Sequence, residues 1–125
     1  FAGNVGTQKT RPGLIVNLTN DAWFGTTIGP WQHLYHAQMR AVEEGVPLLR
    51  VANTGISAAF DGFGRLLGSI PLGENGYLDI PVPSVLSAPP FARFGNTVFF
   101  AICISVVLTA CVMQARHIQV DEYEA

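Results

Sequence analysis

Over its first two thirds the chain alternates between short apolar runs and polar turns, and this pattern predicts an α/β layer. Residues 13–19 (GLIVNLT) form a nearly continuous apolar run between Pro12 and Asn20. A run of this kind predicts a strand that is covered on both faces and central in its sheet. Later runs have the length and composition of strands, at 47–53 (PLLRVAN), 56–60 (ISAAF), 65–70 (RLLGSI) and 77–80 (YLDI).

Apolar residues recur at helical spacing between the first two of these runs. Pro30 suits the first turn of a helix, and Gly45 and Pro47 are placed to end it. The periodic positions are Trp31, Leu34, Tyr35 and Val42, with Ala37 and Ala41 alongside. The turn at 61–64 (DGFG) predicts a hairpin. The order of strand, helix, strand and hairpins therefore predicts an α/β sheet that ends in antiparallel strands.

The composition changes at Pro81. Four prolines lie between 81 and 90, which predicts an extended connecting loop over 81–95 after an α/β part at 1–80. Residues 96–115 carry no charge, and as a helix they are about 30 Å long, the thickness of the hydrocarbon core of a bilayer. A buried core helix is the alternative, but it normally has a polar stripe. We expect a transmembrane helix at 96–115 and a polar tail at 116–125.

Charge and cysteine content exclude several classes of function. The formal net charge is −2 and the Lys and Arg residues are scattered, so nucleic acid is not an expected partner. Cys103 and Cys111 both lie in the uncharged run, which favours inert buried thiols over a disulfide framework or zinc ligands. The chain begins with Phe1 and has no signal-peptide pattern, so we expect it to be a piece of a longer protein.

The stretch 20–33 (NDAWFGTTIGPWQH) holds the main candidates for binding. It begins where the first strand ends, and ligands of α/β layers meet the carboxyl ends of strands. Asn20 and Asp21 can cap the turn or bond a neighbouring loop, while Trp23 and Phe24 can wall a pocket. Gly25, like Gly29, would act as a backbone hinge. The residues alone equally allow a plain turn with core aromatics.

The helix adds further candidates. His33 is expected to hydrogen-bond the 20–25 loop, and His36 to be partly exposed. The two histidines are one turn apart, but no third ligand has suitable spacing, so we expect neither a metal nor another cofactor. Arg40 with Glu43 and Glu44 is interpreted as a solvated face, the alternative being an ion pair that steadies the site.

Residues beyond the helix complete the list of candidates. Asn53, Thr54 and Gly55 form a strand-end turn at the expected pocket rim. Ser57 has no neighbouring base and lies in no nucleophile elbow, which argues against a serine hydrolase. Lys9 is the only lysine and precedes the first strand; we do not expect it to be catalytic.

The motifs NDAWFG, QH-x₆-RA-x-E-x-G-x-P-L-x-R and NTGIS, followed by PPFARFGN and a hydrophobic helix, resemble the C-terminal part of the bacterial apolipoprotein N-acyltransferases. These are membrane members of the nitrilase, or carbon–nitrogen hydrolase, superfamily. The resemblance covers residues 13–113. It implies the C-terminal part of a nitrilase-like α/β sandwich, followed by one transmembrane helix, in the bacterial inner membrane with the α/β domain on the periplasmic side.

The resemblance also implies a reaction. A cysteine thiolate would take an acyl chain from a phospholipid as a thioester and pass it to the amine of a diacylglyceryl-cysteine lipoprotein. In that family the nucleophile belongs to a Glu, Lys and Cys triad whose segments would precede Phe1. Cys103 and Cys111 do not replace it, because a thiolate inside a bilayer is costly. We therefore expect the chain alone to have no catalytic residue and no activity.

Two other classes remain open from the sequence. A soluble carbon–nitrogen hydrolase would share the α/β layer and hydrolyse small amides, although the uncharged 96–115 run argues against it. A non-catalytic, membrane-anchored interaction module would also lack a nucleophile.

Overall fold

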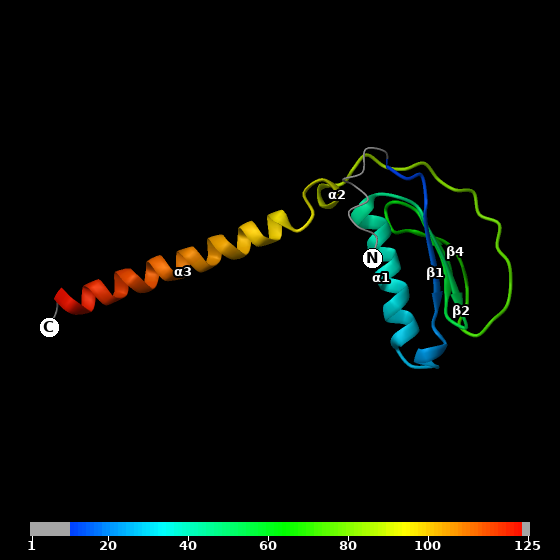
Figure 1. The fold of residues 1–125 in the computed structure, drawn as a ribbon, viewed down its shortest axis with the longest axis horizontal. Coiled ribbons are helices and arrows are strands. Elements are labelled where there is room, and N and C mark those ends of the chain that lie inside the picture. The colour runs from blue at the N-terminus through cyan, green and yellow to red at the C-terminus, as the bar shows by residue number, and fades with distance from the viewer. Residues whose placement is uncertain (1–10, 124–125) are drawn as a thin grey trace. The chain divides into compact units, whose positions relative to one another are not determined.

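The computed structural model describes residues 11–123, and the chain divides into two compact units between Arg93 and Phe94. The first unit holds a four-stranded sheet with one long helix on it (Figure 1). The strands are β1 (Ile15–Asn20), β2 (Leu48–Asn53), β3 (Ser57–Phe60) and β4 (Leu66–Ile70), in the order β1-β2-β3-β4. β1 and β2 are parallel, and the other two pairings are antiparallel. The predicted α/β sheet with an antiparallel end is confirmed.

Helix α1 (Gly29–Glu44) makes the crossover between the parallel strands. Pro30 lies in its first turn, where its fixed φ suits the helix and its missing N–H is not needed. Gly45 ends the helix with a left-handed φ of 64°, and its N–H donates to the carbonyls of Ala41 and Val42. Both boundaries agree with the prediction.

The core lies between α1 and one face of the sheet. Ala37 and Ala41 of the helix pack with Leu48, Ala58 and Phe60 of the strands. Trp31 and Tyr35, which share the predicted helical spacing, lie outside this packed face, because these side chains are 46% and 59% exposed. Alanines allow the helix to approach the sheet closely, and the bulkier residues then point away from it.

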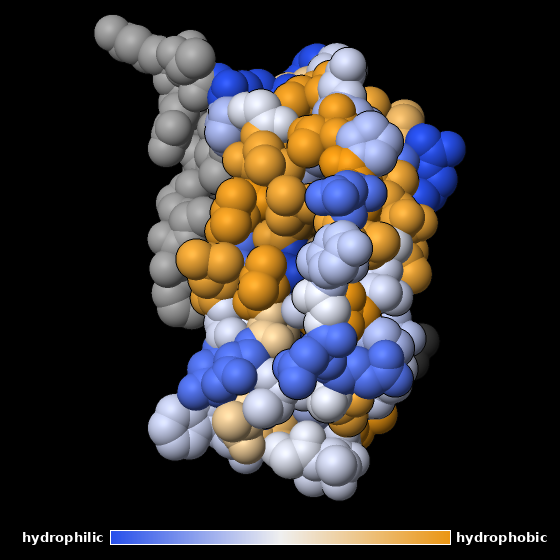
Figure 2. Space-filling view, turned by 90° about the vertical axis from the view of Figure 1, so that its right-hand side faces the viewer, coloured by the Kyte–Doolittle hydropathy of each residue, from blue (hydrophilic) through white to orange (hydrophobic). Residues whose placement is uncertain are grey.

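The opposite face of the sheet is open over β1 and β2. Val16, Leu18 and Val51 are exposed there, and Figure 2 shows hydrophobic residues gathered on this side of the molecule. Within the described chain β1 pairs only with β2, so it is an edge strand. The prediction of a central strand covered on both faces is therefore wrong for this chain, since no described element lies beyond β1 or over Leu18.

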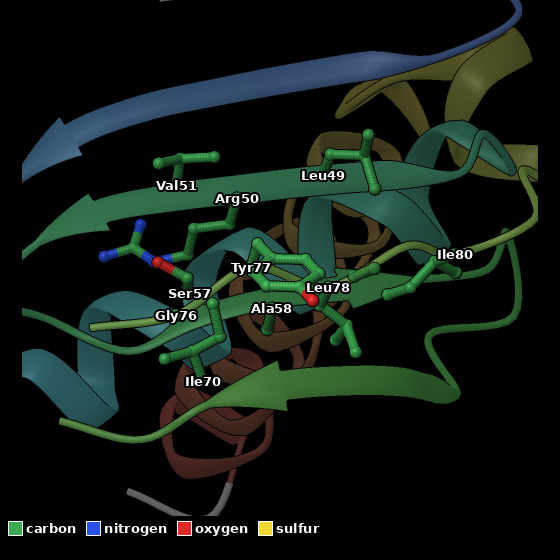
Figure 3. Close-up of a pocket in the computed structure, with 11 residues that line it drawn as sticks. Leu49, Arg50, Val51, Ser57, Ala58, Ile70, Gly76, Tyr77, Leu78 and Ile80 are labelled. Atoms are coloured by element: carbon green, nitrogen blue, oxygen red, sulfur yellow. The ribbon is translucent and has the colours of Figure 1, made fainter. Parts of the chain in front are cut away.

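The antiparallel half of that face is covered by the segment 76–80, of which 77–80 was predicted to be a strand. The structure gives it no strand pairing. Leu78 and Ile80 instead pack on Gly68, where a Cβ would lie 2.5 Å from Leu78 Cδ2 (Figure 3). Glycine leaves room on β4 for these side chains, so the segment crosses the face of the sheet and does not extend its edge.

The β3–β4 turn is held by Asp61. Its Oδ1 accepts the N–H groups of Phe63 and Arg65 at 2.9 Å each, and its Oδ2 accepts Arg65 Nε at 2.7 Å. Burial by itself raises the pKa of Asp61, but these donors outweigh it and leave that pKa below its ordinary value. Gly64 has φ +77°, as the predicted hairpin turn requires.

Residues 81–89 have no helix or strand, as predicted, but the connection ends in a short helix, α2 (Pro90–Phe94), with Ala92 buried. The second unit is helix α3 (Thr97–Tyr123). Its part Thr97–Gln114 is long and apolar enough to cross a membrane, and none of it is buried. Cys103 and Cys111 are exposed along this part. The helix runs into the predicted polar tail, and Lys9 lies outside the described residues.

Candidate functional site

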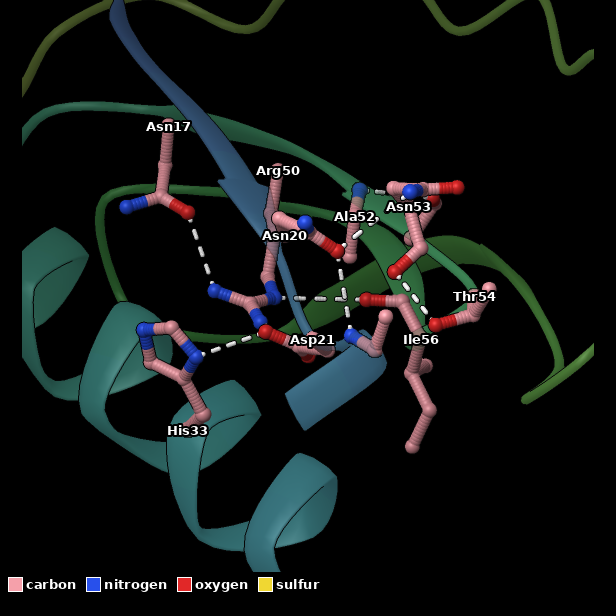
Figure 4. A network of polar contacts seen from close by, with 11 residues as sticks. Asn17, Asn20, Asp21, His33, Arg50, Ala52, Asn53, Thr54 and Ile56 are labelled. Carbon is pink, nitrogen blue, oxygen red and sulfur yellow. Dashed lines mark hydrogen bonds and ion pairs between the residues drawn. The ribbon is translucent and has the colours of Figure 1, made fainter. Parts of the chain in front are cut away.

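A buried ion pair connects the carboxyl end of β1 to the middle of β2. Asp21 follows β1 directly, and Arg50 lies in the middle of β2. Arg50 Nη2 donates to Asp21 Oδ2 at 2.6 Å, and neither side chain is exposed. Buried charges are tolerated when they are paired and hydrogen-bonded, so each residue needs the other (Figure 4).

The guanidinium of Arg50 bonds two further segments. Nη1 donates to Asn17 Oδ1 at 2.9 Å, and Nε donates to the carbonyl of Ile56 at 3.3 Å. Arg50 thus connects β1, the loop after β1 and the turn that precedes β3. The planar guanidinium can do this because its donors point in fixed, different directions.

His33 of α1 completes the network. Its Nδ1 lies 2.8 Å from Asp21 Oδ1, and its ring packs edge-on against Phe24 with centroids 5.8 Å apart. The carboxylate paired with Arg50 can only accept hydrogen bonds, so Nδ1 carries the proton. The side chain is 35% exposed. A buried carboxylate therefore holds the imidazole in one orientation and one tautomer, and the predicted bond from His33 to the loop is confirmed.

The loops after β1 and β2 are joined directly. The N–H of Asp21 donates to the carbonyl of Asn53 at 3.1 Å, and Asn53 Nδ2 donates to Asn20 Oδ1 at 3.3 Å. Gly55 packs on the Asp21 carboxylate so closely that a Cβ would lie 2.2 Å from Oδ2. Thr54, which lies between Asn53 and Gly55 in the sequence, has φ +59°, which is uncommon for a residue other than glycine. The structure thus brings the predicted pocket and rim residues together, while their role in binding stays a prediction.

Of the two aromatic residues of the loop, Phe24 contacts the His33 ring and Trp23 is largely exposed. Trp23 and Phe24 lie in a short 3₁₀ helix, η2 (Ala22–Phe24), and are 83% and 40% exposed. Gly25 has φ +55°. Gly29 lets the Phe24 ring lie close to the start of α1, because a Cβ at Gly29 would lie 2.6 Å from Phe24 Cδ1. A cavity beside this loop is lined by Ala22, Gly25, Thr26, Thr54, Leu72 and Gly73. Trp23 does not line it, so the wall that Trp23 would form stays a prediction.

A second cavity opens on the other face of the sheet. Leu49, Val51, Ser57, Ile70, Tyr77 and Leu78 are among its lining residues (Figure 3). Ser57 donates no bond to a base there; its hydroxyl accepts the N–H of Ala52 at 3.1 Å. This contact gives Ser57 a structural role, whereas the sequence argued only against a serine hydrolase.

The polar face of α1 is only partly as predicted. His36 is exposed, and Arg40 pairs with Glu43 at 3.0 Å on the surface, which confirms the solvated face for these residues. Glu44 is an exception, because it is 2% exposed. The prediction was wrong for Glu44 because the last turn of α1 directs it to the same side of the helix as the buried Ala37 and Ala41.

Sequence reasoning missed Arg50 and Asn17, although a signal was present. Each is a polar residue inside an apolar run that predicts a buried strand. A buried arginine or asparagine needs partners, so two such residues on parallel neighbours indicate a polar network.

Comparison with known proteins agrees with this fold. Residues 8–88 match the family model described as carbon-nitrogen hydrolase. This span covers the whole sheet, α1 and the polar network. The chain belongs to the carbon-nitrogen hydrolase family.

Relatives with curated names are similar over most of this chain. The apolipoprotein N-acyltransferase of Bradyrhizobium diazoefficiens is 48% identical over 88% of the chain, and that of Rhodopseudomonas palustris is 40% identical over 93%. The apolipoprotein N-acyltransferase of Rickettsia bellii is 39% identical, also over 93%. The chain spans 20%, 22% and 24% of these relatives' lengths, respectively.

Proposed function

We propose that the chain is a part of an apolipoprotein N-acyltransferase and supplies one side of its acyl-transfer site. The donor would be a membrane phospholipid, and the acceptor the amine of a diacylglyceryl-cysteine lipoprotein. The resemblance of NDAWFG, the α1 motif and NTGIS to that family supports this, together with the similarity to relatives of that name.

The observation that carries the proposal is the network of Asp21, Arg50 and His33. It fixes the loop 20–25 against the loop 53–55 at the strand ends, where α/β layers bind ligands. A rigid frame of this kind holds a thioester or an amine in reacting geometry. Trp23 and Phe24, which the frame carries, offer apolar surface for an acyl chain.

The reactive thiolate is proposed to come from outside these 125 residues. The chain has two cysteines, and both are on the apolar part of α3. A thiolate there would lack the cationic or hydrogen-bonding partners that lower a thiol's pKa. The glutamate and lysine that would act with the nucleophile as base and as oxyanion stabiliser are likewise proposed to lie elsewhere.

The membrane setting follows from the same proposal. Helix α3 would cross the bacterial inner membrane over Thr97–Gln114, with the α/β unit on the periplasmic side. Both substrates are lipids, so a tether of this kind keeps the site where they are found.

The test is a two-step assay on the complete protein that contains this segment. A phospholipid with a labelled acyl chain should leave label on the protein as a thioester that hydroxylamine releases. A synthetic peptide that begins with diacylglyceryl-cysteine should then become N-acylated. The 125-residue chain alone should do neither, and His33→Ala in the complete protein should slow the reaction while the exposed neighbour His36→Ala does not.

Two results would contradict the proposal. Hydrolysis of small amides without acylation of the peptide would favour the soluble amidase class. Acylation of the peptide by the 125-residue chain alone would place the nucleophile inside it and refute the assignment of the thiolate to another segment.

A further inference from the structure

Helix α1 carries a second apolar stripe that does not face the sheet. Its members are one or two turns apart and all exposed: Trp31 46%, Tyr35 59%, Met39 57% and Val42 40%. The buried stripe of Ala37 and Ala41 already serves the core. A helix with two apolar stripes normally has a partner on each.

The stripe is free of charged neighbours along most of its length. Between Asp21, which is buried, and Arg40 the sequence has no Asp, Glu, Lys or Arg. The polar side chains His36, Arg40 and Glu43 lie on the other exposed side of the helix. Trp and Tyr, with an apolar ring and a polar tip, are the residues enriched at membrane–water interfaces.

The stripe continues to the point where the tether begins. Val42 packs beside the hairpin turn, since a Cβ on Gly64 would lie 2.6 Å from Val42 Cγ2. Phe63 of that turn is 62% exposed, and the Arg65 guanidinium lies 5.0 Å from its ring centroid. Val42, Phe63, Leu86 and Pro89 line one shallow cavity, and α2 starts at the next residue, Pro90.

The chain length between the two units is short. The first unit ends at Arg93, and the apolar part of α3 begins at Thr97, the fourth residue after it. Four residues reach at most about 14 Å. Once α3 crosses a bilayer, the end of the first unit is therefore held close to the membrane surface.

We propose that the α1 stripe (Trp31, Tyr35, Met39 and Val42, with Phe63) rests in the interfacial layer of that bilayer, so that α1 lies along the membrane surface. The proposal rests on the membrane-spanning role proposed for α3. Burial of the rings among the headgroups removes apolar surface from water, and the exposed Arg65 beside Phe63 suits anionic headgroups.

The experiment measures the depth of Trp31 in the full chain, reconstituted in vesicles of phosphatidylethanolamine and phosphatidylglycerol. The chain has two tryptophans, so Trp23→Phe leaves Trp31 as the single emitter. Lipids brominated high on the acyl chain should remove at least about half of the Trp31 emission, because an interfacial helix sits about 5–10 Å into the headgroup and acyl boundary. Aqueous iodide should quench it weakly.

Two further variants separate the stripe from the rest of α1. In the Trp23→Phe background, Tyr35→Glu places a charge on the stripe and should restore iodide quenching and reduce bromine quenching. His36→Glu, at the next exposed position of the same helix, should change neither. If Tyr35→Glu fails to fold, the parent Trp31 measurement still decides the question.

The other outcomes contradict the inference in distinguishable ways. A chain inserted in the vesicles with Trp31 open to iodide and unaffected by bromine overturns the inference alone. Trp31 shielded from both quenchers, with cross-linked dimers at high dilution in lipid, assigns the stripe to a second copy of the chain and also overturns it. A chain recovered in the aqueous fraction overturns the proposed membrane role together with the inference.

Discussion

Arg50 Nη2 and Asp21 Oδ2 lie 2.6 Å apart, and both side chains are fully buried. The pair joins residues 29 positions apart and connects β2 to the loop that begins the NDAWFG motif. Because α1 also bonds Asp21 through His33, one carboxylate fixes three elements around the candidate site. The position of the loop therefore depends on a buried ion pair.

Replacement of Arg50 should strongly destabilise the first unit. Arg50→Met leaves a buried carboxylate without its cation, and we expect a loss of about 3–5 kcal/mol in the free energy of unfolding. Urea unfolding in detergent micelles, followed by tryptophan emission, measures this unit because Trp23 and Trp31 both lie in it. Arg40→Ala, which removes only the surface pair with Glu43, should cost less than about 0.5 kcal/mol. Equal losses would contradict the importance of the buried pair.

Gly55→Ala should disturb the junction of the two loops. Its methyl group would lie 2.2 Å from Asp21 Oδ2, so the backbone must shift, at a cost of about 1–3 kcal/mol. Gly13→Ala is the matched control, since no atom lies within 4 Å of a Cβ there. The same urea titration should find Gly13→Ala within about 0.5 kcal/mol of the parent chain. If Gly55→Ala left the free energy of unfolding unchanged, the loops would not be packed as described.

Asp61 should make stability depend on pH in the acid range. Its folded pKa lies below the unfolded value of about 3.9, so its contribution is complete above that value and is lost as pH falls through the folded pKa. Asp61→Asn should lower the free energy of unfolding at pH 7 by about 1–2 kcal/mol and flatten its decline below about pH 4. Urea titrations from pH 3 to 7 test this, and an unchanged slope in the variant would contradict the assignment.

Trp23→Ala should separate activity from stability. The side chain is 83% exposed, so its removal should change the free energy of unfolding by less than about 0.5 kcal/mol. If Trp23 walls the acyl pocket of the complete protein, acyl transfer should nevertheless fall by about tenfold or more, corresponding to at least about 1.4 kcal/mol of lost transition-state stabilisation. Tyr77→Ala, at an exposed residue on the far face of the sheet, is the control. Unchanged turnover in Trp23→Ala would exclude Trp23 from the site.

The sequence by itself determined the strands β1 to β4 and helix α1, although not the path of segment 77–80 or the short helix α2. Pro30 and Gly45 bound α1 because one fixes φ and the other allows a left-handed φ, and both effects are local to the backbone. The sequence also placed Asn20 and Asn53 at the ends of strands, but their pairing was found only in the structure.

Only the tertiary structure decided which apolar stripe of α1 meets the sheet and which polar residues are buried together. The helical spacing of Trp31 and Tyr35 fits a core face as well as the spacing of Ala37 and Ala41 does. Which of the two stripes packs on the sheet depends on how closely the helix can approach the strands. Likewise, the sequence around Arg50 and around Asp21 does not indicate that these two side chains pair. Packing distance and the need to pair a buried charge are properties of the folded chain, which no single stretch of sequence contains.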